Sequence, residues 1–578
     1  MTGPLSASRI VAAGFRPAAG WPIFAALILA CLMIPEAAAQ RRPPSAFNEI
    51  PPASSAYERR PPSVIREELD PVLAADGSGL PHELWNGLSA AQFAEAISAL
   101  ALPPRSPVLL GLWRRLIGSD TVPATGADGA RFTALRVEAL EQSGLIDEVA
   151  AVLARDLEAE HDPLLRALTA RSEIGLGNVE RGCEIAHGLR TAQSGLPKPI
   201  EADLILISGY CAAASGNTAA ASIQAGLLRE LEFGGLGADL LDAVSGGLKP
   251  DIPSDARLSL LDYRIAALGG APDSARLMSA ATPALLAGLA HDPRLAPDVR
   301  LAAGEAAARL NGLAAEDLAP LYRADGAGSD AGSIERAGLF KAAEREGAAL
   351  SKARMIRAFL DEARRSGLDW PALQLMAGPA RALEPVPEIG WFAETAVEIN
   401  LASGDYGAAR RWAQFVDAPY TANRPSHSLA HWMALIDLAD PASGSDPGRS
   451  FSGVEALAAQ GRVDPAVLHR LVTALDALDI AVPMGLWELA GRTAQPAGGH
   501  LPETGVLSEL AEASEKKQFG RTVLLVMRAI GPGTAESAHM LALGDAIRAL
   551  KRAGLATEAR RLALESLFGR WPRGVPAR

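Results

Sequence analysis

Hydrophobic positions recur with helical spacing along most of this chain, and five stretches share a finer pattern. In each stretch an apolar helical segment ends at a glycine, and a second helical segment begins at once. The five glycines are Gly144, Gly177, Gly216, Gly404 and Gly554. A helix that ends at glycine and restarts immediately folds back as one half of an antiparallel pair. The pattern therefore predicts repeated helical hairpins.

The positions expected to face across each hairpin hold small or apolar residues. They lie seven residues before, five after and nine after the glycine. They are Val137, Ala170, Gly209, Val397 and Ile547; then Val149, Gly182, Ala221, Ala409 and Ala559; then Leu153, Ala186, Ala225, Ala413 and Ala563. Small residues let two helix backbones approach closely, but one hairpin cannot bury its apolar face alone. We therefore predict an all-α fold, a superhelical stack of antiparallel helix hairpins (an α-solenoid).

Length and charge fit this architecture. A chain of 578 residues is too long for one hydrophobic core, whereas the core of a solenoid grows lengthwise with each hairpin. Aromatic residues make up only 5% of the chain, and β-branched runs are scarce, which favours helix. The net charge of −12 is spread over the chain. Because no basic stretch could follow a phosphate backbone, we expect no nucleic-acid partner.

The N-terminal residues 1–39 have the three parts of an export signal. Arg9 and Arg16 supply positive charge, an apolar core follows over 21–35, and alanines at 37–39 offer a cleavage site before Gln40. The apolar core is shorter than the roughly 18 residues that a membrane span needs. We predict a cleaved signal peptide and a periplasmic protein of a Gram-negative bacterium. The alternative is an uncleaved anchor in the inner membrane, and we expect no other membrane contact.

Two further segments divide the remaining chain. Residues 40–66 hold three Pro-Pro pairs and little apolar periodicity, which predicts a disordered linker. Residues 324–333 (ADGAGSDAGS) contain no large apolar side chain, which predicts a flexible loop. This loop would separate helical-repeat lobes at 67–323 and 334–578. A joint between two lobes and an inserted loop on one continuous superhelix both remain open.

The first helices of the body are expected over 81–100 and 108–117. Cleavage of the signal would leave Cys183 and Cys211, an even number that favours pairing in an oxidising compartment. The two cysteines lie almost equally far from a turn expected near 195–197, so their heights along an antiparallel helix pair differ by roughly 3 Å or less. We predict a disulfide. The alternative is two buried, small apolar side chains.

One turn carries a resemblance to a known repeat family. Gly404-Asp405-Tyr406 with Ala409 is similar to the hairpin turn of tetratricopeptide repeats, and Gly177-Asn178 and Gly216-Asn217 match in part. Gly144 and Gly554 match only in the glycine and the apolar spacing. The early Trp, the Leu-Gly pair and the closing Pro of that family are mostly missing, and the repeat spacing drifts from roughly 34 residues. The resemblance implies a superhelix whose concave face, lined by the first helix of each hairpin, holds a peptide or protein.

Motifs that carry catalysis are missing from the sequence. It contains no Gly-x-Ser-x-Gly elbow, no His-Glu-x-x-His helix, no Walker-type loop, no dinucleotide-binding fingerprint and no paired Cys-x-x-Cys. We therefore expect no enzymatic activity and no cofactor. The remaining candidate for metal binding is His427 with His431, whose spacing places both on one helix face. We favour the alternative of ordinary histidines on a partly exposed helix.

Three tryptophans, Trp391, Trp412 and Trp432, fall within one segment. They could line an aromatic groove for a peptide or a glycan. The interpretation that we favour is that these bulky rings fill the core where alanine-rich packing leaves gaps.

Three functions remain for comparison with the structure. The first is a non-catalytic periplasmic scaffold or adaptor that binds another envelope protein or peptide. The second is a peptidoglycan-associated protein, since the Ala-rich composition is similar to the superhelical arm of murein transglycosylases, here without their catalytic domain. The third is a membrane-tethered assembly factor with an uncleaved N-terminal anchor. The sequence predicts neither the partner's identity nor the oligomeric state.

Overall fold

The computed structural model describes residues 83–575, apart from 120, 127, 157–158, 190–194, 234, 271, 418–427, 441 and 443–446. These residues form 27 α-helices and two 3-10 helices, and their β-type pairing is limited to three isolated bridges. The all-α prediction is thus confirmed. The predicted signal peptide (1–39) and Pro-rich linker (40–66) lie outside the described residues.

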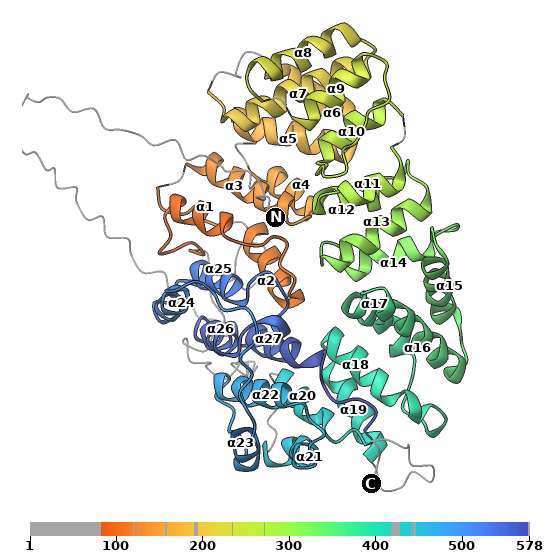
Figure 1. Cartoon of the computed structure of the whole chain (residues 1–578), viewed down its shortest axis with the longest axis vertical. Coiled ribbons are helices and arrows are strands. Elements are labelled where there is room, and N and C mark those ends of the chain that lie inside the picture. Colours follow the sequence, from red (N-terminus) through yellow and green to blue (C-terminus); the bar gives the residue numbers. More distant parts are fainter. Residues whose placement is uncertain are drawn as a thin grey trace, which may run out of the picture. The chain divides into compact units, whose positions relative to one another are not determined.

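The first eight described helices are drawn in red to yellow in Figure 1. They are α1 (Ala90–Ser98), α2 (Pro107–Gly118), α3 (Gly129–Gln142), α4 (Ile146–Arg155), α5 (Pro163–Leu176), α6 (Val179–Gly188), α7 (Lys198–Ala214) and α8 (Thr218–Glu230). Helices α3 and α4, α5 and α6, and α7 and α8 pack as hairpins around the first three glycine turns.

The middle of the chain continues with single helices and pairs. They are α9 (Leu236–Ser245), α10 (Leu260–Leu268), α11 (Ser274–Ala280), α12 (Pro283–His291), α13 (Pro297–Arg309), α14 (Ala315–Arg323), α15 (Ala331–Arg345), α16 (Ala349–Arg365) and α17 (Asp369–Arg381). From α12 to α21 each helix packs against the next one in the chain, which fits an α-solenoid.

The last part of the described chain includes two more of the glycine hairpins, α18 with α19 and α26 with α27. Its elements are η1 (Pro387–Phe392), α18 (Ala393–Ser403), α19 (Tyr406–Asp417), α20 (Trp432–Ala439), α21 (Pro447–Ala459), α22 (Pro465–Ala477), α23 (Met484–Gly491), α24 (Val506–Glu515), α25 (Phe519–Ile530), η2 (Ala535–Ser537), α26 (Met540–Arg552) and α27 (Ala556–Phe568).

All five turn glycines adopt the left-handed backbone that a helix reversal needs. Their φ angles are 76° at Gly144, 94° at Gly177, 81° at Gly216, 77° at Gly404 and 92° at Gly554. A side chain with a Cβ atom is strained in this region, which explains why glycine stands there. The fifteen positions expected to face across the hairpins are all buried. The pattern of glycines and small residues therefore marks the positions where the two helices of each hairpin pack together.

Helix starts follow simple capping chemistry. Four helices begin with a Ser, Thr or Asp whose side chain accepts a backbone N–H, followed directly by proline at the first helical position. The four starts are Ser106-Pro107, Asp162-Pro163, Thr282-Pro283 and Asp464-Pro465. Proline sets the helical φ and lacks the N–H that would remain unpaired there, so these dipeptides place the beginning of each helix.

Capping also explains two differences from the sequence analysis. The helix expected over 81–100 begins only at Ala90, because Ser89 and Gln92 form a reciprocal capping box. The loop expected over 324–333 ends at Asp330, whose carboxylate accepts the Ser333 N–H at 2.8 Å and starts α15. The predicted boundary between the lobes therefore lies in a short connection between α14 and α15, and these two helices pack together.

Later helices cover the faces of the first hairpins. Helix α10 packs against α5 and α7, and α12 packs against α3. A Cβ atom added to Gly175 of α5 would lie 3.1 Å from the Cβ of Leu260 in α10. These are the first helices of their hairpins, which the family resemblance implied would line an open concave face.

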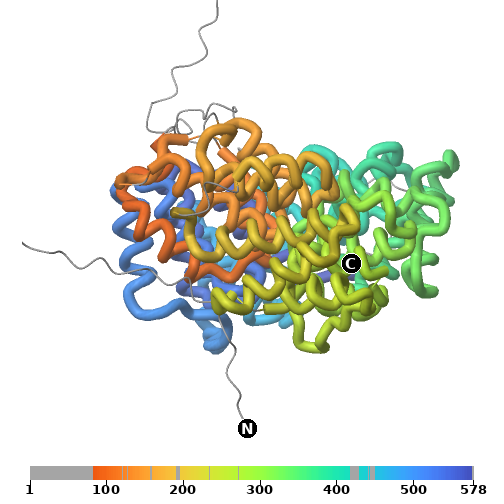
Figure 2. The backbone as a smooth tube through the Cα atoms, turned by 90° about the horizontal axis from the view of Figure 1, so that it is seen from above, coloured from red at the N-terminus to blue at the C-terminus, as the bar shows by residue number. Residues whose placement is uncertain are grey.

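The two ends of the described chain meet. Helix α2 packs against α25 and α27, and α1 packs against α25. Figure 2 shows the first helices, in red, beside the last ones, in blue. Hairpin α5–α6 is also joined to α7 by a disulfide between Cys183 and Cys211, whose Cα atoms lie 5.8 Å apart. Stacking is therefore supplemented by one covalent link and by closure between segments far apart in sequence.

Two glycine turns offer a matched test of this packing. We expect Gly216→Ala to lower the free energy of unfolding by about 1 kcal/mol, because its left-handed backbone disfavours a Cβ atom that otherwise meets nothing within 4 Å. Gly144→Ala should cost about 1–2 kcal/mol more, because its Cβ would lie 3.0 Å from the Pro283 carbonyl of α12. Urea unfolding of both variants measures the difference, and equal costs would contradict the close contact between the first turn and α12.

Candidate functional site

Three adjacent chambers form a recess around the beginning of α2, and we call them together the central crevice. Their volumes are 150, 780 and 460 Å³, and all three are lined by Pro107 and Trp370. In Figure 1, α2 and α27 lie on one side of this region and α13, α14 and α17 on the other. The crevice is therefore built by helices from the beginning, middle and end of the described chain.

Trp370 occupies the first turn of α17, directly after the turn at Gly367. Its ring packs edge-on against Phe568 of α27, with a centroid distance of 5.4 Å. Its buried indole Nε1 has no hydrogen-bond partner among the described residues. A buried donor without a partner is costly, so the packing around Trp370 must offset this cost.

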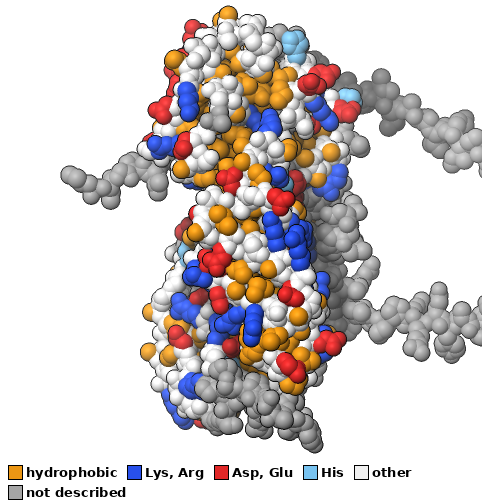
Figure 3. Space-filling model, turned by 90° about the vertical axis from the view of Figure 1, so that its right-hand side faces the viewer, with side chains coloured by type: hydrophobic (Ala, Val, Ile, Leu, Met, Phe, Trp, Pro, Cys, Tyr) orange, Lys and Arg blue, Asp and Glu red, His pale blue; other side chains and the backbone are white. Residues whose placement is uncertain are grey.

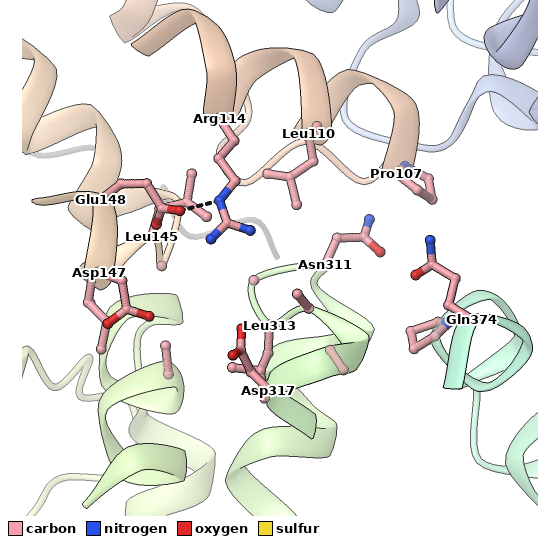
Figure 4. Close-up of a pocket in the computed structure, with 18 of the residues that line it drawn as sticks. Pro107, Leu110, Arg114, Leu145, Asp147, Glu148, Asn311, Leu313, Asp317 and Gln374 are labelled. Atoms are coloured by element: carbon pink, nitrogen blue, oxygen red, sulfur yellow. Dashed lines mark hydrogen bonds and ion pairs between the residues drawn. The ribbon is translucent and has the colours of Figure 1, made fainter. Parts of the chain in front are cut away.

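The smallest chamber is acidic, and we call it the acidic chamber. Figure 4 shows Arg114 of α2 paired with Glu148 of α4, with Asp147 of α4 and Asp317 of α14 nearby. The amide side chain of Gln374 reaches the same space from α17. The chamber thus carries three carboxylates from the first turns of α4 and α14 and one guanidinium group from α2.

The largest chamber is lined by four arginines, and we call it the arginine chamber. They are Arg105, Arg309, Arg364 and Arg573. Several of them share carboxylates. Arg364 and Arg573 both bind Glu398, at 2.8 and 2.5 Å, and Arg309 shares Glu305 with Arg336. Because one carboxylate neutralises only one guanidinium group, the shared pairs leave excess positive charge here.

The third chamber lies beside the turn that best matches the tetratricopeptide pattern, and we call it the tyrosine chamber. Gly404 and Tyr406 line it, together with Arg561 and the ion pair between Arg115 and Glu558. The wall of α2 therefore faces α27 across a charged contact, with the α18–α19 turn at one end.

A buried carboxylate holds α2 in place. Glu565 of α27 accepts hydrogen bonds from Ser106 Oγ at 2.6 Å, from Ala535 N at 2.9 Å and from Val108 N at 3.4 Å. Ser106 is also the N-cap of α2, so the carboxylate sits where the helix dipole favours negative charge. Burial nevertheless raises the pKa of Glu565 to about 7, although these hydrogen bonds oppose the shift.

The structure describes only one member of the candidate histidine pair. His427 lies outside the described residues. His431 is buried, and its Nε2 lies 2.8 Å from the Pro572 carbonyl oxygen. Since a carbonyl oxygen only accepts, Nε2 carries the hydrogen. Burial lowers the pKa of His431 to about 4, so the ring is neutral and fastens the segment after α27. The described residues contain no group of three or more His, Cys, Asp or Glu side chains placed to hold a metal ion.

The aromatic groove considered from the sequence is not formed by the three tryptophans. Trp412 and Trp432 are buried in the core, and Trp432 Nε1 donates to Glu394 at 3.2 Å. Trp391 is 43% exposed, on 3-10 helix η1. Helical packing of α18–α20 turns two of these rings inward, so they cannot share a groove with the third.

The aromatic residue that lines all three chambers is Trp370, which the sequence analysis did not single out. The available signal was local: Trp370 follows the Gly367 turn and precedes Pro371 in the first turn of α17. A tryptophan at a helix start can be read from the sequence. The sequence does not reveal that α2 and α27 lie opposite Trp370, because both helices are distant from it in the chain.

Comparisons with protein-family models, with curated proteins and with solved structures each found no match for this chain. The likeness to tetratricopeptide repeats therefore remains a resemblance in its turns. Among the described residues, none of the helices is both long and apolar enough to span a bilayer.

Replacing Glu565 by glutamine should change how stability depends on pH. Between the unfolded pKa of 4.5 and the folded value of about 7, the folded chain keeps a proton that the unfolded chain has lost. The free energy of unfolding of the unmodified protein therefore falls as pH rises through this window, by up to about 3 kcal/mol from this group.

Glu565→Gln removes that titration, so the variant should gain stability relative to the unmodified protein between pH 5 and pH 8. Urea unfolding at several pH values measures this difference. A stability difference that stays constant across the window would show that Glu565 does not hold the proton.

Proposed function

We propose that this protein is a non-catalytic helical-repeat adaptor of the bacterial cell envelope, and that it holds a segment of another protein in the central crevice. The observation that carries the proposal is the set of three adjacent chambers around Trp370. Two of them, with volumes of 780 and 460 Å³, fall within the size range of ligand sites, roughly 300–1,000 Å³. Their succession suits an elongated occupant more than a small compact one.

The composition of the walls also favours a polypeptide. Leu110, Trp370 and Phe568 offer apolar surface, while guanidinium, carboxylate and amide groups alternate around them. A peptide presents the same mixture of apolar and polar groups along its length. Sites of this kind combine an apolar body with a few placed polar groups that orient the ligand.

The location differs from the one that the family resemblance implied. The first helices of the first three hairpins are packed against α10 and α12, so their faces are engaged within the chain. The surface drawn in Figure 3 shows acidic and basic side chains interspersed over the described residues. We therefore place the partner in the crevice, where carboxylates predominate in the acidic chamber and arginines in the arginine chamber.

A photo-crosslinking amino acid at Gln374 tests the site, because this exposed residue lines two of the chambers. We expect it to form an adduct of one reproducible mass with an envelope protein. Gly111→Phe should abolish the adduct. Gly111 is an exposed helical residue of α2 in the same lining, and a Cβ added there meets nothing within 4 Å, so phenylalanine fills the crevice without a clash at its Cβ.

Gly338→Phe is the matched control. Gly338 is also an exposed helical glycine with free space at the Cβ position, but it lies on α15, outside the linings of the chambers. We expect the adduct to persist in this variant. An adduct that survives Gly111→Phe, or that is lost equally in both variants, would rule out the crevice as the binding site.

The proposed export to the periplasm leads to a separate prediction. If the chain is exported and cleaved, protein released by osmotic shock should have the mass of a chain that begins at Gln40. It should show no free thiol before reduction and two afterwards, because Cys183 and Cys211 are bonded and Cys31 leaves with the signal. Intact-mass spectrometry and thiol titration in denaturant measure both quantities. Full-length protein retained in washed membranes would instead support the anchored alternative.

A further inference from the structure

We infer that the arginine chamber receives a carboxylate of the bound segment, so that the partner presents an acidic stretch to this protein. The inference rests on the proposed function and deepens it by naming the chemistry of the partner. It starts from the charges that line the 780 Å³ chamber.

The positive charge of the chamber is not matched by its neighbours. Arg364 and Arg573 share the carboxylate of Glu398, and Asp361, which Arg364 also contacts at 3.5 Å, binds Arg357 at 3.2 Å as well. The guanidinium group of Arg105 donates to the backbone carbonyl of Arg309 at 3.0 Å, and a carbonyl carries no net charge. Guanidinium groups that are held in place but incompletely neutralised are ready to pair with an anion.

The lining also holds three carboxylates against its four arginines. Asp369 is exposed at the beginning of α17, and the other two are already engaged. Glu565 accepts three hydrogen bonds at the beginning of α2, and Glu536 binds Arg570 at 2.6 Å. Neither is available to neutralise Arg105 or the second arginine on Glu398. Arg105 therefore brings to the chamber a positive charge whose hydrogen-bond partner is an uncharged carbonyl.

Both the side chain and the backbone of Arg105 are fixed by hydrogen bonds to the C-terminal end of α13 and the residues that follow it. Its guanidinium binds the Arg309 carbonyl, and its own carbonyl accepts the Asn311 Nδ2–H at 2.8 Å. Because its backbone and its side chain are both fixed, less conformational entropy is lost when a ligand binds. Arg105 is also exposed, so a charge change there leaves the core untouched.

Inorganic phosphate shares the anionic chemistry of a carboxylate, but the surroundings favour a peptide. The arginine chamber shares Pro107 and Trp370 with the two neighbouring chambers, and Phe568 adds apolar surface. A free phosphate ion would not contact the apolar walls. An acidic residue within an extended segment would use both the arginines and the apolar surface beside them.

The test selects short random-sequence peptides displayed on phage against the full chain at low salt. We expect the selected peptides to be rich in Asp and Glu and to lose binding to Gly111→Phe, which marks them as crevice ligands. A fluorescein-labelled peptide from this set should bind Arg105→Glu about ten-fold more weakly or worse, as measured by fluorescence anisotropy. Arg105→Gln should show a smaller loss, because the charge is removed but not reversed.

Arg354→Glu is the control for the charge change, since Arg354 is exposed on α16 and lies outside the linings of the chambers. It should bind like the unmodified protein. Millimolar inorganic phosphate should compete only weakly. Phosphate that binds alone with dependence on Arg105, while no acidic peptide is selected, would overturn the inference in favour of a small-anion site.

The remaining outcomes separate the two proposals. Peptides that bind in the crevice without acidic enrichment, or that are insensitive to Arg105→Glu, would overturn the acidic-segment inference and leave the proposed function standing. Peptides that are all insensitive to Gly111→Phe, or a failure to select any, would count against the crevice as the binding site and remove both.

Discussion

The contact on which the site depends is the one between Glu565 and the beginning of α2. Ser106 and Glu565 are 459 positions apart in the chain, and their side chains lie 2.6 Å apart. The carboxylate holds the N-cap of α2 and one backbone N–H of η2 together. All three chambers are lined by Pro107, the residue after this N-cap. If α2 were not held there, each chamber would lose a wall. The shape of the crevice therefore depends on the contact between the first and the last described helices.

Shared carboxylates are the second constraint on this region. Glu305 accepts from Arg336, Arg309 and the Tyr322 hydroxyl, and Glu398 accepts from Arg364 and Arg573. Burial of a charge is costly unless it is paired, so each buried carboxylate collects several donors. The same arrangement leaves more guanidinium groups than carboxylates where these networks reach the surface. Packing and the electrostatics of the arginine chamber thus have a common origin.

The prediction of hairpins succeeded because its signals are local. A glycine with φ of 76° at Gly144 or 94° at Gly177 is required by one helix reversal, and small residues at fixed spacing belong to the same pair. The prediction of site residues was poorer. Trp412 and Trp432 are conspicuous in the sequence but are buried, while Trp370 lines the crevice only because α27 and α2 lie beside α17. Nothing within the segment around Trp370 reveals those neighbours.

The sequence by itself determined the all-α class, the positions of the reversals and the capped starts of many helices, because each depends on residues within one or two turns of each other. Only the tertiary structure decided that α10 and α12 would cover the first helices of the early hairpins, and that the first described helices would meet the last. Those arrangements arise from apolar faces that have several geometrically acceptable partners along a long chain. The choice among partners is made by complementary packing and by buried charge pairs between distant segments, which helical periodicity does not encode.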